Sequence, residues 1–191
     1  MKINYNGVIV CFKERSMIEK FKPTWQVKRI YSLTPEELKR AGIKAVLTDL
    51  DNTLIAWDNP EGTVELKRWI AEMEAAEIPV VVVSNNSHAR VKRALSHIEL
   101  PFVSRSLKPF GYGIRRALKK LNLNTDQVVM VGDQLITDIL AANITGTRSI
   151  LVKPLLDSDA WNTKINRFFE FFIKKRLVQK YPGTDWQEEI K

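Results

Sequence analysis

The chain of 191 residues contains one cysteine, two histidines and no apolar run long enough to cross a membrane. The single cysteine, Cys11, excludes an internal disulfide and favours a reducing, cytoplasmic setting. The apolar run at residues 7–12 falls far short of the roughly 18 residues of a spanning helix, and it is too short for a signal peptide. His88 and His97 are nine residues apart on a predicted helix, so no Cys/His set for zinc is indicated.

The net charge of +8 is concentrated in two flanks. Residues 1–33 carry seven Lys/Arg against two Asp/Glu, residues 160–180 carry six against one, and residues 34–159 carry sixteen of each. Basic flanks are either solvated surface or contact sites for phosphate-bearing partners. We therefore expect a basic N-terminal segment (1–33), a core (34–156) and a basic amphipathic C-terminal helix (157–191) packed on or beside the core.

Apolar runs alternate with segments of helical periodicity along the core. Thr34 and Glu37 form a capping box with Pro35 at the first helical position. The alternation predicts an α/β fold, a three-layer Rossmann-like parallel sheet with helices on both faces. The predicted strands are 45–48, 79–84, 101–103, 128–132 and 149–152, and the predicted helices are 35–42, 64–77, 87–97, 110–121, 135–142 and 158–180.

Polar side chains follow four of the predicted strands. In an open α/β sheet the carboxyl ends of the strands share the edge where ligands bind. Several carboxylates buried together require a cation, and an all-oxygen set suits Mg²⁺. The residues at these ends are Asp49 and Asp51, then Ser84 and Asn85, then Lys108, and finally Asp133 and Asp138.

These residue types can carry out phosphoryl transfer. One carboxylate can attack phosphorus, and Asp51, two residues on and therefore on the same side of an extended strand, can act as acid and base. Lys108 and Mg²⁺ would neutralise the phosphoryl oxygens, and Ser84 would hydrogen-bond them together with backbone N–H groups after Asn85. Each feature alone could be a turn, a helix cap or a solvated loop. Four in order, each after an apolar strand, favour a catalytic site.

The same segments resemble the four motifs of the haloacid dehalogenase (HAD) superfamily. They are Asp49-Leu-Asp51-Asn-Thr-Leu54, Ser84, Lys108-Pro109 and Gly132-Asp133-Gln-Leu-Ile-Thr-Asp138. A finer resemblance is to the capless subfamily IIIA phosphatases of the YqeG type, related to phosphatidylglycerophosphatase. It is carried by Asn85-Asn86, the segment from Leu33 to Lys44 and the loop Trp57-Asp58-Asn-Pro60, and it weakens before about residue 22.

The resemblance implies a Mg²⁺-dependent phosphatase that forms an aspartyl-phosphate. An aspartate at position 51 implies hydrolysis, because dehalogenases and P-type ATPases differ there. The implied roles are Asp49 as nucleophile and metal ligand, Asp51 as acid/base with its backbone carbonyl on the metal, Ser84 and Lys108 as phosphoryl-binding residues, and Asp133 and Asp138 around the metal.

The spacing of the motifs leaves no room for a lid. About eight residues, 55–62, follow the first motif, and one helix and one short strand fit between Ser84 and Lys108. An open site suits a phosphate carried on something large. Together with the basic flanks, the resemblance to phosphatidylglycerophosphatase implies phosphatidylglycerophosphate at a membrane surface as the substrate. Soluble phosphomonoesters or phosphoproteins are an alternative. A nucleic-acid or ribosome-associated binding protein is a second one, which the absence of an RNA-binding motif disfavours.

The terminal helix has an apolar face with a basic surround. This face could pack on the sheet or on a partner subunit, or it could rest on an anionic bilayer. The sequence does not indicate an oligomeric state. The apolar residues are Trp161, Ile165, Phe168, Phe169, Phe172 and Ile173, and the basic ones are Lys164, Arg167, Lys174, Lys175, Arg176 and Lys180.

Overall fold

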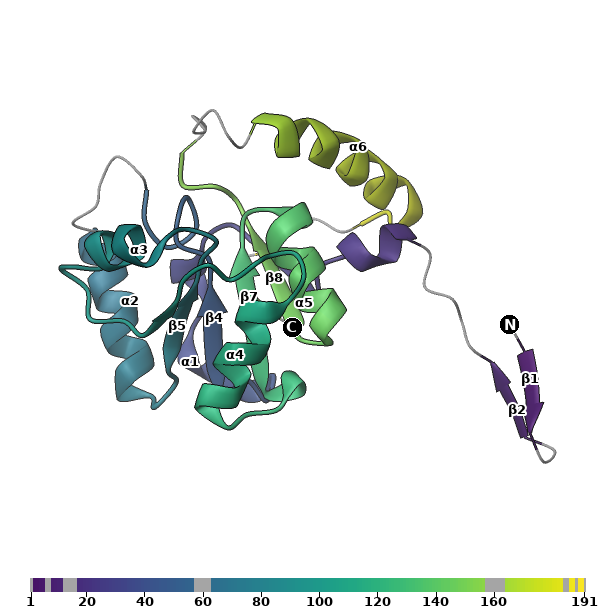
Figure 1. Cartoon of the computed structure of the whole chain (residues 1–191), viewed down its shortest axis with the longest axis horizontal. Coiled ribbons are helices and arrows are strands. Elements are labelled where there is room, and N and C mark those ends of the chain that lie inside the picture. The colour runs from purple at the N-terminus through teal and green to yellow at the C-terminus, as the bar shows by residue number, and fades with distance from the viewer. Residues whose placement is uncertain are drawn as a thin grey trace.

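A six-stranded parallel sheet forms the centre of the molecule (Figure 1). The structure is a computed structural model, and it describes residues 2–5, 8–11, 17–56, 63–156, 164–183, 186–187 and 189–190. The strand order is β3-β8-β7-β4-β5-β6, and every neighbouring pair is parallel. The strands are β3 (Trp25–Val27), β4 (Ala45–Thr48), β5 (Val80–Val83), β6 (Phe102–Val103), β7 (Val128–Gly132) and β8 (Arg148–Val152), while β1 (Lys2–Tyr5) and β2 (Val8–Cys11) form a two-stranded antiparallel sheet.

Helices cover both faces of the sheet, so the predicted three-layer α/β architecture is confirmed. Successive residues of a strand point to opposite faces. Ala45 and Leu47 of β4 accordingly lie in one apolar cluster, and Val46 lies in the other. Helices α1 (Pro35–Arg40), α2 (Val64–Ala75) and α3 (His88–Ala94) supply residues to the Val46 cluster, whereas α4 (Tyr112–Leu121) and α5 (Leu140–Thr145) supply the opposite one.

Capping interactions locate the helix ends more accurately than the spacing of apolar residues does. The Thr34 hydroxyl accepts a hydrogen bond from Glu37 N, and the Glu37 carboxylate accepts one from Thr34 N, as the capping box predicts. Helix α3 ends at Ala94, before the predicted end near His97. Buried Leu95 and Ile98 continue the apolar spacing beyond the last helical turn, which explains the error.

Strand β3 was not predicted. It lies within residues 1–33, which composition sets apart as a basic segment, and it extends the main sheet at β8. Trp25 pairs with Ile150 and Val27 with Val152. Three residues are too few to show a period of two, so tertiary pairing with the neighbouring strand decides this element.

The helix predicted at 135–142 begins as a different structure. Residues Leu135–Ile139 form a π-type turn, in which Ile139 N donates to the carbonyl of Gln134 at 3.3 Å, before α5 continues to Thr145. Such turns are frequent at functional sites. This one carries Asp138.

The C-terminal helix α6 (Lys164–Lys180) packs against the core through a face that shares Ile173 with the predicted one. Leu177 is buried and Ile173 packs in the same cluster, with Leu135 and Ile139 of the π-type turn. Glu170 is buried one turn earlier, and its carboxylate accepts a hydrogen bond from Ile136 N at 3.1 Å. Residues 170, 173 and 177 share one side of a helix, so they define the packed face.

Two residues of the predicted apolar face lie off that side. Phe169 and Phe172 are 55% and 51% exposed, so packing on the sheet does not account for them. Of the other predicted members, Trp161 lies outside the described residues, as do the expected helix start at Ser158 and the side chains of Ile165 and Phe168. Among the described residues, no helix combines the length and the apolarity needed to cross a bilayer.

The strand order changes direction at β4. The chain runs from β4 to β5 and β6 on one side, then returns to β7 and β8 on the other. Ligand sites of α/β sheets form outside the carboxyl ends at such a switch point. Between Ser84 and Lys108 the regular elements are α3 and β6, so no lid lies there, as predicted. The other place for a lid, residues 57–62 with the loop from Trp57 to Pro60, lies outside the described residues.

Candidate active site

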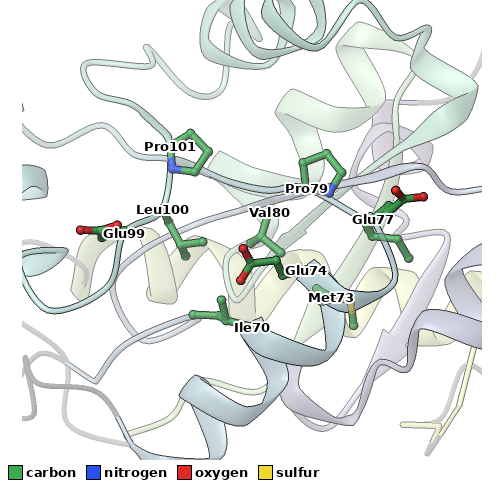
Figure 2. Close-up of a pocket in the computed structure, with 10 residues that line it drawn as sticks. Ile70, Met73, Glu74, Glu77, Pro79, Val80, Glu99, Leu100 and Pro101 are labelled. Atoms are coloured by element: carbon green, nitrogen blue, oxygen red, sulfur yellow. The ribbon is translucent and has the colours of Figure 1, made fainter.

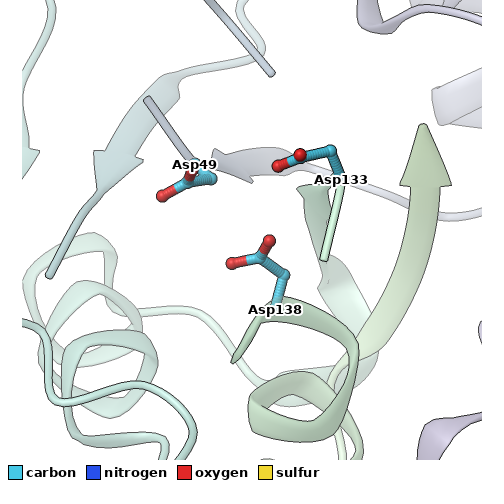
Figure 3. Close-up of side chains that lie close together, drawn as sticks. All are labelled: Asp49, Asp133 and Asp138. Carbon is cyan, nitrogen blue, oxygen red and sulfur yellow. The ribbon is translucent and has the colours of Figure 1, made fainter. Parts of the chain in front are cut away.

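Three aspartates from two neighbouring strand ends meet at the switch point (Figure 3). Asp49 follows β4, Asp133 follows β7, and Asp138 lies on the π-type turn. One carboxylate oxygen of each lies within 4.8 Å of the others. The donor set is all oxygen and triply acidic, which fits a hard divalent cation.

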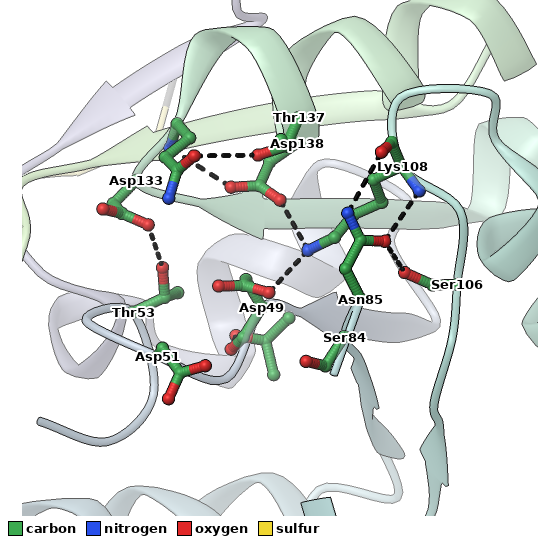
Figure 4. A network of polar contacts seen from close by, with 12 residues as sticks. Asp49, Asp51, Thr53, Ser84, Asn85, Ser106, Lys108, Asp133, Thr137 and Asp138 are labelled. Atoms are coloured by element: carbon green, nitrogen blue, oxygen red, sulfur yellow. Dashed lines mark hydrogen bonds and ion pairs between the residues drawn. The ribbon is translucent and has the colours of Figure 1, made fainter. Parts of the chain in front are cut away.

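Lys108 bridges two of these aspartates (Figure 4). Its buried ammonium lies 2.5 Å from Asp49 Oδ1 and 2.7 Å from Asp138 Oδ1. Burial lowers the pKa of Lys108, but the charges and hydrogen bonds of Asp138 and Asp49 outweigh it, and the net pKa is raised. Lys108 therefore stays charged. One ammonium against three carboxylates leaves the cluster negative, which is the physical reason that a bound cation would stabilise it.

Asp49 is held in a mixed electrostatic environment. Burial raises the pKa of its carboxyl to about 6, Lys108 opposes the rise, and Asp138 adds to it. At neutral pH the carboxylate is therefore mainly ionised, as a nucleophile requires. A pKa near 6 also keeps this carboxylate more basic than an exposed aspartate.

Asp51 lies beside Asp49 but has different partners. Its two carboxylate oxygens accept hydrogen bonds from Asn86 Nδ2 at 2.6 Å and from Arg90 Nη2 at 2.9 Å. Its side chain does not belong to the cluster of three aspartates described above. The structure thus separates the two residues of the Asp-x-Asp pair into different environments.

Ser84 and Asn85 follow β5 and contact different groups. The Ser84 hydroxyl is buried and accepts from Asn86 N and Asn86 Nδ2, at 3.2 and 3.1 Å. The Asn85 amide instead fixes the loop that carries Lys108. Its oxygen accepts from Ser106 Oγ and Lys108 N, and its nitrogen donates to the carbonyl of Lys108. The expected role of Asn85 in binding phosphate stays a prediction, and the contacts of its side-chain amide are with Ser106 and Lys108.

Gly132 permits the close approach that closes the cluster. A Cβ atom there would lie 2.3 Å from Asp138 Cγ, well inside contact distance. The Asp138 carboxylate is held by Gln134 N at 3.2 Å, and that of Asp133 by the Thr53 hydroxyl at 3.1 Å. The Asp138 carboxylate can therefore occupy this position only because residue 132 has no side chain.

Sequence reasoning did not assign site roles to Thr53, Asn86, Arg90 and Ser106. Thr53 and Asn86 lay within motifs already recognised, so their signal was present but unused. Arg90 is four residues after Asn86, hence near it at the start of α3, a spacing that could have suggested a shared contact. Ser106 carried no signal, because its role depends on the loop conformation.

A hollow of about 330 Å³ lies at the opposite edge of the sheet (Figure 2). Pro79 and Pro101, which precede β5 and β6, form part of its wall. The described lining includes three glutamates, Glu74, Glu77 and Glu99, and no lysine or arginine. It does not suit a phosphate ester, which is itself an anion.

The chain is similar in sequence to known proteins. Residues 107–160, which include Lys108 and both Asp133 and Asp138, match the family model described as HAD-hydrolase-like. A protein named probable phosphatase YqeG from Bacillus subtilis (strain 168) is 40% identical over 173 residues, covering 90% of this chain and 100% of that protein. The chain belongs to the YqeG-type phosphatases of the HAD superfamily. As a member it is a phosphoric monoester hydrolase.

Two other likenesses are more distant. A protein named phosphatidylglycerophosphate phosphatase 1, chloroplastic/mitochondrial, from Arabidopsis thaliana is 26% identical over 94% of this chain, which spans 55% of that protein. A crystal structure of an uncharacterized protein from Listeria monocytogenes serotype 4b aligns at 17% identity with a TM-score of 0.49. The alignment covers 70% of the present chain and 99% of the Listeria chain.

Proposed function

We propose that the protein is a Mg²⁺-dependent phosphatase that hydrolyses phosphatidylglycerophosphate at a membrane surface. Its nucleophile is Asp49. The observation that carries the catalytic part is the convergence of Asp49, Lys108, Asp133 and Asp138 at one edge of the sheet. These groups come from separate motifs. Bringing three carboxylates together is electrostatically unfavourable, which supports a functional reason for the arrangement.

The reaction proceeds in two steps on the chain's own residues. An oxygen of Asp49 attacks phosphorus, the bond from phosphorus to the ester oxygen breaks, and Asp51 donates a proton to the departing alkoxide. Asp51 then removes a proton from water, which attacks the aspartyl-phosphate and releases inorganic phosphate. The Ser84 hydroxyl and the Lys108 ammonium bind the phosphoryl oxygens throughout.

The three clustered carboxylates of Asp49, Asp133 and Asp138 would hold the metal through their oxygens. The family resemblance implies that the backbone carbonyl of Asp51 would contribute as well. When bound, Mg²⁺ draws charge from the phosphoryl oxygens and screens the approach of the anionic ester to Asp49.

Asp51 must exchange partners during this cycle. In the described state Asn86 and Arg90 donate hydrogen bonds to its two oxygens. An arriving phosphoryl group offers Arg90 a competing anion. Release of Asp51 from Arg90 would let it take up the proton that the leaving group needs.

The lipid substrate is supported by the surface around the site. No lid lies between Ser84 and Lys108, so a headgroup in a bilayer could reach Asp49. Helix α6 is tied to the π-type turn through Glu170, and it presents Phe169 and Phe172 beside basic residues. Aromatic and basic side chains together suit an anionic lipid interface. The Arabidopsis relative bears the name of an enzyme for this lipid.

The test is phosphate release from phosphatidylglycerophosphate in mixed micelles, compared with nucleotides, sugar phosphates and a phosphopeptide. We expect the lipid to have the highest kcat/KM, activity to be lost in EDTA and restored by Mg²⁺, and Asp49→Asn to lower turnover roughly a thousandfold or more. A clear preference for a soluble ester would reject the lipid. Near wild-type turnover by Asp49→Asn would reject the nucleophile, and salt-sensitive RNA retention without hydrolysis would favour the binding-protein alternative.

A further inference from the structure

Three large apolar side chains are exposed beside the catalytic lysine. Leu107, Phe110 and Tyr112 are 58%, 73% and 51% exposed, although Ser106 and Lys108 are buried. We call these three residues the apolar rim. Leu107 and Phe110 lie on one short loop, where Phe110 N donates to the carbonyl of Leu107 at 2.8 Å, and Tyr112 is the first residue of α4.

The loop conformation holds the rim outward. Leu107 has a φ of 52° and Arg105 one of 48°, in the left-handed region that residues with a side chain rarely adopt. Asn85 fixes the backbone on the inner side of Leu107, through Lys108 and Ser106. An exposed leucine in an unfavourable backbone conformation contributes little to the stability of the fold. Its presence at position 107 therefore favours a role in binding.

The rim belongs to the catalytic edge of the sheet. The loop leaves the carboxyl end of β6 and enters the N-terminus of α4, and both ends lie on the side where Asp49 emerges. The Lys108 side chain points into the aspartate cluster (Figure 4). A surface that contacts the rim would therefore lie next to the opening of the active site.

Arginines surround the apolar rim. Arg105 precedes it and Arg115 follows on α4, and both are exposed. The guanidinium of Arg115 donates to the carbonyl of Phe110 at 2.9 Å, so this charge is held at the rim. Arg90 is exposed at the same edge, where it contacts Asp51. The apolar side chains of the rim suit the acyl layer of an anionic bilayer, and the arginines beside them suit its negatively charged headgroups.

We propose that the apolar rim docks this protein on an anionic lipid bilayer, with Leu107, Phe110 and Tyr112 inserted between headgroups. The inference rests on the proposed function for one point only, which is that docking would present a lipid-borne ester to Asp49. Vesicle binding itself needs no substrate and no turnover. Burial of one aromatic side chain should strengthen binding about tenfold.

The experiment compares sedimentation with vesicles of phosphatidylglycerol and phosphatidylcholine, and with vesicles of phosphatidylcholine alone. The variants are Phe110→Ser/Tyr112→Ser, Phe110→Trp, and the control Ile144→Ser, which changes an exposed apolar residue of α5 that is not part of the apolar rim. Thermal unfolding and turnover of p-nitrophenyl phosphate report on the fold and on the catalytic site.

We expect the double variant to lose anionic-vesicle affinity at least tenfold, with p-nitrophenyl phosphate turnover unchanged within about twofold. Ile144→Ser and Phe110→Trp should bind like the wild type. Unchanged binding by the double variant, or equal binding of the wild type to both vesicles, would overturn the proposal. Rim-dependent binding in a protein that prefers soluble esters would retain the docking surface while rejecting the lipid substrate.

Discussion

Asp49 is surrounded by groups that act on its proton in opposite directions. Burial and Asp138 favour the protonated carboxyl, whereas Lys108 favours the carboxylate, and the resulting pKa is about 6. An ordinary aspartate has a pKa near 4. The same carboxyl is therefore both ionised at neutral pH and unusually costly to ionise, a cost that a bound divalent cation would offset.

This pKa predicts how the metal-free protein responds to pH. The pKa of Asp49 is higher in the folded protein than in the unfolded one. Protonation of Asp49 therefore adds to the free energy of unfolding; this contribution is fully present below about pH 4 and is lost as pH rises through about 6. In EDTA, the free energy of unfolding of the wild type should fall by about 3 kcal/mol relative to Asp49→Asn between pH 4 and 7. Urea denaturation of both proteins at several pH values measures the difference. Parallel pH dependences would contradict it.

At the level of elements, the start of α3 organises the residues after β5. Asn86 connects Ser84 to Asp51, while the next residue, Ser87, caps the helix by accepting from Arg90 N. Adjacent residues thus have separable roles, one in the site and one in the helix.

Replacing these two residues should give different results. Asn86→Ala removes the hydrogen bonds that orient Asp51 and Ser84, so kcat should fall about a hundredfold with little change in stability. Ser87→Ala removes only the cap, so it should cost about 1 kcal/mol of stability and leave kcat within a few fold. Steady-state kinetics and thermal unfolding of both variants check this. Equal kcat values for the two would refute the role of Asn86.

The junction between β7 and the π-type turn is a second element-scale feature. Gly132→Ala would place a Cβ atom 2.3 Å from Asp138 Cγ and displace that carboxylate. We expect a loss of about 1–3 kcal/mol in stability and the loss of thermal stabilisation by Mg²⁺. Gly183→Ala is the control, since its Cβ would meet nothing within 4 Å, although its φ of +85° adds strain. A Mg²⁺ response in Gly132→Ala equal to that of the control would be inconsistent with this geometry.

For the whole molecule, a net charge of +8 and the exposed arginines of the catalytic edge act together on an anionic surface. Salt screens such attraction over about 10 Å at 0.1 M and about 3 Å at 1 M. Raising NaCl from about 0.05 to 0.5 M should therefore weaken binding to phosphatidylglycerol vesicles at least tenfold.

The same salt series should leave turnover of p-nitrophenyl phosphate within about twofold, because buried ion pairs such as Lys108 with Asp138 are screened much less. Vesicle sedimentation and an absorbance assay in the same buffers provide both values. Binding that is insensitive to salt would show that charge is not what attracts the protein to the bilayer.

Much of the fold and the site was predictable from sequence because parallel strands deliver their carboxyl ends to one edge. Asp49, Ser84, Lys108 and Asp133 could be placed at one edge of the sheet because each follows a predicted parallel strand. The capping box at Thr34 likewise needs only local information. In each case the determining interaction lies within a few residues or follows from a general rule of α/β topology.

The tertiary structure alone decided what depends on contacts between distant segments. It pairs β3 with β8, turns Asn85 toward Lys108, brings Arg90 to Asp51 and packs α6 through Glu170 and Leu177 rather than through Phe169 and Phe172. Periodicity shows that a helix has an apolar side, but the neighbouring surface determines which residues are covered. The sequence thus determined the chemistry and the edge where it occurs, and the packed chain determined which side chains hold it and which face outward.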